Sequence, residues 1–207
     1  MRIRKRYWGG LGILSALAGT LVLLAALPSS ASDNAQHVRW DIVSNPTGGV
    51  DPQTLNPGGQ ASATAPNMGG TITLKGSGTF VAPASGGGSS AATGGGSWTT
   101  FSSVGSETGS GTYTVTGLVS WVNASPQTPN PSTIDNIDHG TRVNGTAVLR
   151  IAFSDGKDGV LTIGCHGAGA PPGIFEGIAT TKGSTTYYIV PDPVRGVDAG
   201  RTNFHVR

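Results

Sequence analysis

Cys165 and His166 are the neighbouring residues of this chain whose types come closest to a catalytic dyad. A thiolate that an imidazole activates is a nucleophile. Adjacent residues on a strand point to opposite faces, however, so these two side chains would not meet. Because Leu161, Ile163 and Cys165 share the phase of the expected core face, we predict a buried structural cysteine. His166 is then expected to be exposed at a strand end.

A second cluster, Asp135, Asp138 and His139, places two carboxylates and an imidazole close together in the sequence. Oxygen and nitrogen donors of this kind bind divalent metals. A mononuclear site usually needs three or four protein ligands, and no spaced partner motif accompanies the cluster. The sequence therefore favours a solvated turn before Gly140 over a metal site. It also predicts no cofactor, because it contains no zinc spacing, phosphate-cradling loop or dinucleotide fingerprint.

Glu176 stands out because the chain has only one other glutamate and because apolar residues flank it on both sides. Burial in apolar surroundings raises the pKa of a carboxyl group, which would suit it to general acid catalysis. The same carboxyl group could equally accept hydrogen bonds from backbone amides or pair with Lys182. The candidate catalytic residues of the chain are Glu176, His166 and Tyr187.

The elements that would position these residues are β-strands. After residue 31, runs of β-prone residues alternate with Gly, Ser, Pro and Asn clusters, and no stretch there sustains a helical period. The clearest unit is a hairpin of residues 146–153 and 160–165, because the Asp-Gly pairs between them suit a tight return. Another strand is expected at residues 112–122. Its predicted core-facing side chains are Tyr113, Val115, Val119 and Trp121.

Shorter runs complete the predicted fold. Further strands are expected at residues 38–43, 71–81, 98–104, 173–180, 185–190 and 202–206. The Gly/Ser/Ala-rich residues 83–97 are expected to form a flexible surface loop. In the last strand, the phase of Phe204 and Val206 predicts that His205 faces solvent. The pattern predicts an all-β domain, an antiparallel meander that forms either a barrel-like domain or a sandwich.

The N-terminal residues have the pattern of an export signal. Four cations at positions 2–6 precede the uncharged apolar residues 7–27, and Pro28 and small residues follow. We expect a secretory signal helix that is cleaved after Ala31, with an uncleaved membrane anchor as the alternative. The predicted organisation is a signal peptide at 1–31, an N-terminal strand and Gly/Pro/Ala-rich linker at 32–70, and an antiparallel β domain at 71–207.

The charge of the chain changes sign when the signal is removed. The whole chain has 13 Lys and Arg against 11 Asp and Glu, and without the four signal cations 9 cations face 11 anions. The apparent basicity therefore gives no support for nucleic-acid binding. The expected partner is an unknown ligand or protein at the cell surface. Contact with a membrane is expected only through the signal, if it stays uncleaved.

Several motifs are distributed along the chain: SGTFV at 77–81, GTYTV at 111–115, DGVLT at 158–162 followed by Cys165-His166, PPGIFEG at 171–177 and RTNFHV at 201–206. They resemble those of uncharacterised exported bacterial β-rich proteins. The resemblance spans most of residues 70–206 and implies a shared fold and export, without catalytic residues. The stretch 175–177 before paired tyrosines is also similar to the barrel shared by allene oxide cyclases and dirigent proteins, which implies a fold only.

Two functions are compatible with these observations. The first is a non-enzymatic binding or structural module outside the cell or at its surface, which low charge, Ser/Thr-rich strands and long loops favour. The second is a barrel enzyme or small-molecule carrier whose cavity holds Glu176, Tyr187 and His166. An enclosed apolar pocket in which Glu176 and a histidine converge would favour the second function.

Overall fold

The computed structural model describes residues 35–47, 52–66, 70–83, 87–188 and 200–207. The predicted signal and its cleavage site lie outside these residues. The described part consists of strands, turns and loops without a helix, which confirms the all-β prediction. It accordingly contains no helical segment long and apolar enough to cross a membrane.

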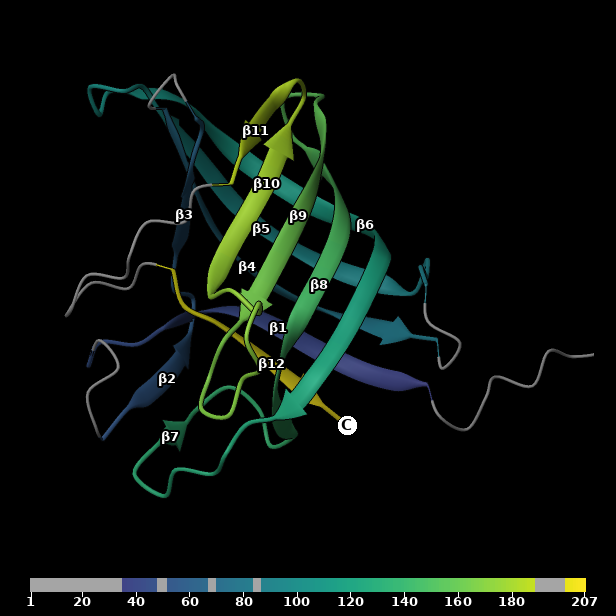
Figure 1. Cartoon of the computed structure of the whole chain (residues 1–207). Helices are drawn as coiled ribbons and strands as arrows, with labels where there is room; N and C mark the ends of the chain where they lie inside the picture. The colour runs from purple at the N-terminus through teal and green to yellow at the C-terminus, as the bar shows by residue number, and fades with distance from the viewer. Residues whose placement is uncertain (1–34, 48–51, 67–69, 84–86, 189–199) are drawn as a thin grey trace, which may run out of the picture. The chain divides into compact units, whose positions relative to one another are not determined.

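The described residues form a sheet of twelve strands, whose order is β11-β10-β9-β8-β6-β5-β4-β1-β2-β7, with β12 beside β1 and β8 and with β3 beside β4 (Figure 1). The strands are β1 (Gln36–Ser44), β2 (Thr54–Pro57), β3 (Ala61–Thr64), β4 (Thr71–Ala82), β5 (Ala92–Phe101), β6 (Glu107–Pro126), β7 (Ile134–Asp135), β8 (Thr141–Phe153), β9 (Asp158–Cys165), β10 (Gly177–Lys182), β11 (Thr185–Tyr187) and β12 (Thr202–Val206). β2 and β7 pair in parallel, whereas the other pairs are antiparallel, so the sheet is mixed. The stretch predicted as a linker contains β2 and β3.

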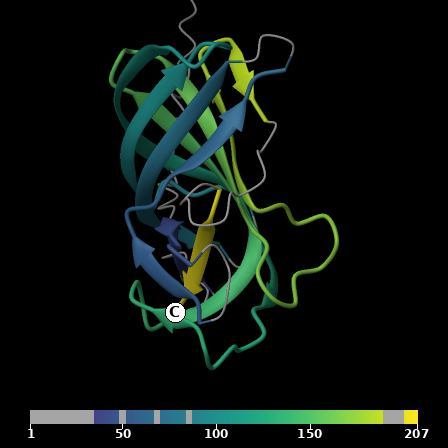
Figure 2. The ribbon, with the colours of Figure 1, turned by 90° about the vertical axis from the view of Figure 1, so that its left-hand side faces the viewer.

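The last strand connects two distant parts of the sheet. β12 pairs with β1 through Trp40 and Phe204 and with β8 through Val143 and Phe204. The pairings that run from β1 through β4, β5, β6 and β8 therefore lead back through β12 to β1. Figure 2 shows β4 and β5 in front of the green strands β8 and β9, and the apolar core lies between them.

Two aromatic groups occupy this core. In the first, the Trp121 ring meets Phe80 and Phe204 edge-on, at centroid distances of 5.3 and 4.7 Å. In the second, Trp98 meets Phe153 edge-on at 5.9 Å. Edge-to-face pairs add stability beyond the burial of their area. Both groups join strands that are far apart in the sequence.

The predicted hairpin is confirmed, and the predicted face of β6 is wrong in part. β8 and β9 pair from Gly145–Cys165 to Ala152–Asp158. In β6, the pairing with β8 shifts its register between Val115 and Gly117 and again between Leu118 and Ser120. Each bulge reverses the alternation of faces. Leu118 is consequently fully buried, whereas Val119 is only half-buried.

The prediction of a flexible loop over residues 83–97 is also wrong in part, because β5 already begins at Ala92. Its glycines lie opposite those of β4, with Gly96 paired to Gly76 and Gly94 to Gly78. A Cβ atom on Gly96 would lie only 1.8 Å from the carbonyl oxygen of Lys75. The glycines therefore permit a close approach of two strand backbones, a role that composition alone does not distinguish from loop flexibility.

Candidate functional site

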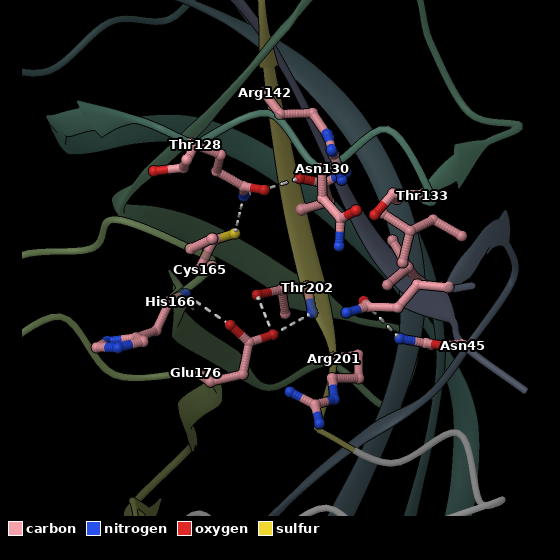
Figure 3. A pocket seen from close by; sticks show the side chains of 17 residues that line it. Asn45, Thr128, Asn130, Thr133, Arg142, Cys165, His166, Glu176, Arg201 and Thr202 are labelled. Carbon is pink, nitrogen blue, oxygen red and sulfur yellow. Dashed lines mark hydrogen bonds between the residues drawn. The ribbon is translucent and has the colours of Figure 1, made fainter. Parts of the chain in front are cut away.

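A polar pocket of about 340 Å³ lies where β9 ends and β12 begins (Figure 3). Its wall also includes the loop after β9, residues 127–133 between β6 and β7, and residues near the facing ends of β1 and β2. The polar side chains that line it are Asn45, Gln53, Gln127, Thr128, Asn130, Thr133, Arg142, Cys165, His166, Glu176, Arg201, Thr202 and Asn203.

Glu176 joins two strand ends at one side of this pocket. Its carboxylate accepts hydrogen bonds from the backbone N–H of His166, at 2.6 Å, and of Thr202, at 2.8 Å. The Thr202 hydroxyl donates a further hydrogen bond at 3.4 Å. The partner of Glu176 is therefore the backbone and not Lys182, whose ammonium group contacts Asp155. One carboxylate thus fastens the end of β9 to the start of β12.

Burial raises the pKa of Glu176 to about 7, although the N–H donors of His166 and Thr202 and the charge of Arg201 act in the opposite direction. The direction is the one that the apolar flanks of this residue predict. The carboxyl group therefore changes its charge near neutral pH. Its ability to accept both backbone hydrogen bonds changes with it, because only the carboxylate is an acceptor at both oxygens.

The Cys165 thiol is buried with an exposed fraction of 2%, which confirms the prediction that it belongs to the core face. Burial raises its pKa well above the ordinary value, and the charge of Glu176 raises it further. The side-chain amide of Gln127 donates a hydrogen bond to its sulfur at 3.2 Å. This environment disfavours the thiolate that a nucleophile requires.

The two remaining candidate catalytic residues do not converge on Glu176. The imidazole of His166 lies 2.6 Å from the carbonyl oxygen of Ile174 and points away from the carboxylate in Figure 3. Only the backbone of His166 contacts Glu176. Tyr187 lies on β11, outside the pocket lining, where burial raises its pKa. The arrangement is thus a polar pocket and not an enclosed apolar cavity with a carboxyl–imidazole pair.

Sequence analysis did not identify two donors of the pocket, Arg201 and Asn203. The Nε of Arg201 and the Nδ2 of Asn203 are buried, and neither has a hydrogen-bond partner in the described part of the chain. Figure 3 places the Arg201 guanidinium beside the Glu176 carboxylate. Arg201 comes directly before the short strand β12, and Asn203 lies near its start. So few residues give no periodic pattern that could distinguish a buried side chain from a solvated one.

Two of the three candidate metal ligands, Asp135 and Asp138, bind other side chains. Asp135 accepts a hydrogen bond from His205, with 2.8 Å between Oδ2 and Nε2, and lies 3.8 Å from the Nε of Arg142. Asp138 and Arg207 share two contacts of 2.8 Å. His139 is exposed. In the described part of the chain, no group of three or more His, Cys, Asp or Glu side chains is arranged to hold a metal ion.

The prediction that His205 faces solvent is wrong, because its side chain is completely buried. Both faces of β12 are covered: Phe204 lies in the core, and the segment that carries Asp135 lies against His205 on the other side. Strand alternation identifies an exposed face only when one face is solvated. Asp41 is buried nearby on β1, in a bidentate contact with Arg39 at 2.8 and 2.9 Å.

The carboxyl groups of Asp135 and Asp138 differ from that of Glu176 in their pKa values. Burial acts to raise the pKa of Asp138, but the hydrogen bonds from Arg207 and the Gly140 N–H outweigh it and hold this pKa at about 2. For Asp135, burial is likewise outweighed, chiefly by the hydrogen bond from His205, and the pKa is lowered. Both carboxylates are therefore charged at neutral pH.

Comparison with known proteins gives no relative: no protein-family model, no curated protein and no solved structure matches this chain.

Proposed function

We propose that this chain is an exported, non-enzymatic binding protein whose polar pocket takes a small polar ligand. The observation that carries the proposal is the Arg201 side chain, which lines the pocket while its buried Nε has no acceptor among the described residues. Buried donors are nearly always satisfied in folded proteins, so an unsatisfied one in a polar pocket is typical of a site that a ligand completes.

Two features of the pocket support binding over catalysis. The carboxylate of Glu176 is engaged by two backbone amides and a hydroxyl group, so its lone pairs serve the chain itself. The raised pKa of the Cys165 thiol keeps it protonated at neutral pH. The barrel enzyme with a catalytic Glu176 is therefore the less favoured alternative.

A barrel-like domain, and not a sandwich, is the architecture that we propose for this binding protein. The circuit of pairings through β12 supports it, because a sandwich leaves edges between its two sheets that such a circuit lacks. In small barrels the interior is filled by side chains, and ligands bind at the mouth. The pocket beside the start of β12 is consistent with that position.

Export follows from the N-terminal sequence and is part of the proposal. We expect the mature chain to begin at Ser32, after cleavage of residues 1–31. The mass of the chain recovered from the medium of an expressing bacterial culture measures this directly. Recovery of the chain only in the membrane fraction, with its full mass, would support the anchored alternative.

A thermal-shift screen with small polar compounds tests the binding function. We expect at least one compound to raise the Tm of the wild-type protein by about 2–6 °C at concentrations well above its Kd. Thr133→Phe places an aromatic ring at the pocket wall and should abolish this shift. Thr114→Phe, on an exposed position of β6, is the matched control and should retain it. A screen without a hit, or a T133F variant that responds like the wild type, would contradict the proposal.

A further inference from the structure

Arg201 is held in place by its backbone, whereas the buried Nε of its side chain has no hydrogen-bond partner among the described residues. Its carbonyl oxygen accepts a hydrogen bond from the Val43 N–H at 3.0 Å, and the next residue, Thr202, is fixed by Glu176 at 2.8 Å. The guanidinium therefore projects from a fixed point into the pocket wall. Its buried Nε lacks an acceptor in the part of the chain that the structure describes.

A second donor points to the same conclusion independently. Asn203 is 1% exposed and lines the pocket, and its Nδ2 is buried without an acceptor among the described residues. Its other amide atom, Oδ1, is used by the Phe204 N–H at 3.0 Å. The pocket thus combines two buried donor atoms, Arg201 Nε and Asn203 Nδ2, that lack an acceptor among the described residues. A buried donor in this state carries the cost of its lost hydration, which a bound oxygen acceptor removes.

We infer that the ligand of the pocket is a small hydroxy acid of the size of a sugar acid, whose carboxylate is bound by Arg201. This inference rests on the proposed binding function and names the class of ligand. A guanidinium presents paired N–H donors that match the two oxygens of a carboxylate. Asn203 lies two residues after Arg201 in the sequence and provides a further donor for the same ligand.

Charge in the pocket favours a carboxylate over a phosphate. The other cation of the lining, Arg142, lies 3.8 Å from Asp135, so its charge is partly balanced. The Glu176 carboxylate shares the pocket and repels additional negative charge. Because Arg201 also lies beside Glu176, the pocket holds little excess positive charge, which suits a ligand with a single negative charge better than a phosphate monoester, which carries nearly two.

The rest of the lining favours hydroxyl groups on the ligand. Thr128 and Thr133 contribute hydroxyl groups to the wall, and amide side chains make up much of the remainder. Hydroxyl and amide groups both donate and accept hydrogen bonds, as the hydroxyl groups of a sugar do. The volume of about 340 Å³ lies at the lower end of the range for small-molecule sites, which suits a single sugar-sized ligand.

Isothermal titration of the purified protein with three probes tests this inference. Glucuronate carries the carboxylate, glucose lacks it, and glucose 6-phosphate replaces it with a phosphate. We expect glucuronate to bind at least 10-fold more tightly than either of the other two. Arg201→Gln should weaken glucuronate at least 10-fold, and Arg201→Lys should weaken it less. Arg150→Gln removes the same charge from an exposed position on β8 and should leave binding unchanged.

Each of the following outcomes would overturn the inference and would show which part of it is wrong. Equal binding of glucose would show that the pocket takes neutral ligands, and tighter binding of glucose 6-phosphate would show a phosphate site; either would leave the proposed binding function intact. If none of the three probes binds while another compound passes the T133F test, the ligand class is wrong but the function stands. Unchanged glucuronate binding in R201Q, in a variant with the wild-type Tm, would remove Arg201 from the site.

Discussion

Two regions of this molecule use carboxylates to hold β12 in place, and they do so by opposite means. At the start of the strand, Glu176 accepts hydrogen bonds from neutral backbone amides, and burial raises its pKa to about 7. At the end of the strand, Asp135 and Asp138 face His205 and Arg207, and their pKa values are lowered. We call these regions the Glu176 pocket and the aspartate cluster.

The two regions differ both in burial and in the partners of their carboxyl groups. Backbone amides supply hydrogen bonds without a full positive charge, so desolvation dominates at Glu176. The carboxyl groups of the aspartate cluster are less desolvated, and hydrogen bonds from His205, Arg207 and two backbone N–H groups outweigh the effect of burial there. The carboxylates of the aspartate cluster are therefore charged and paired within the chain, whereas the Glu176 pocket contains the buried Nε of Arg201, which has no hydrogen-bond partner among the described residues.

Among the variants that test this comparison, His205→Ala should change the free energy of unfolding the most. The substitution removes a completely buried side chain and its hydrogen bond to Asp135, and we expect the free energy of unfolding to fall by about 2–4 kcal/mol. Urea denaturation at pH 7 measures the loss. The control His139→Ala, at an exposed neighbour, should change stability by less than about 0.5 kcal/mol. Equal small effects would mean that the aspartate cluster does not stabilise β12.

The Glu176→Gln substitution should remove the part of the pH dependence of stability that comes from this carboxyl group. Because the folded-state pKa of Glu176 is raised from 4.5 to about 7, its favourable contribution is complete below pH 4.5 and is lost as the pH rises to 7. Relative to the wild type, the variant should therefore gain about 3 kcal/mol between pH 4 and pH 8. Denaturation curves across this range measure the difference. A difference that stays constant with pH would refute the raised pKa.

The sequence was sufficient to predict the all-β class and the β8–β9 hairpin, because alternation and Asp-Gly turns are local signals. It also placed Cys165 in the core and anticipated that burial would raise the pKa of Glu176. Such predictions succeed where one face of a strand is solvated, or where the apolar residues that surround a side chain are its neighbours in the sequence.

The other features depend on contacts between distant parts of the chain. Two of the three register shifts between β6 and β8 altered the inward face of β6, and the glycines of β5 belong to a strand because β4 carries glycines opposite them. His205 is buried because Asp135, which lies 70 residues away in the sequence, packs against it. Arg201 became a candidate only when the fold placed it in the pocket. None of these contacts has a local signature.

Thiol labelling sharpens the description of the Glu176 pocket. Cys165 lines this pocket but is nearly completely buried, and its raised pKa disfavours the thiolate. We expect a thiol reagent at pH 8 to react with the native protein on the order of 100 times more slowly than with the protein in urea. Rapid labelling of the native protein would contradict the burial of the thiol.

The smallest effect is expected from Arg207→Ala in the aspartate cluster. The Arg207 side chain is 67% exposed, so its pair with Asp138 should contribute less than about 1 kcal/mol. Because the pKa of Asp138 is lowered to about 2, this contribution is present above pH 4 and is lost as the pH falls towards 2. Denaturation at pH 7 and pH 2 compares the two states. A loss that persists at pH 2 would contradict the pairing.

Mapping of backbone amide NMR shifts during addition of glucuronate tests the ligand-binding role of the Glu176 pocket most directly. We predict saturable shifts at His166, Arg201 and Thr202, and none at Ile137 and Gly140, whose amides bond to the carboxylates of the aspartate cluster. Shifts confined to the aspartate cluster, or no saturable shift at the three pocket amides, would contradict the account.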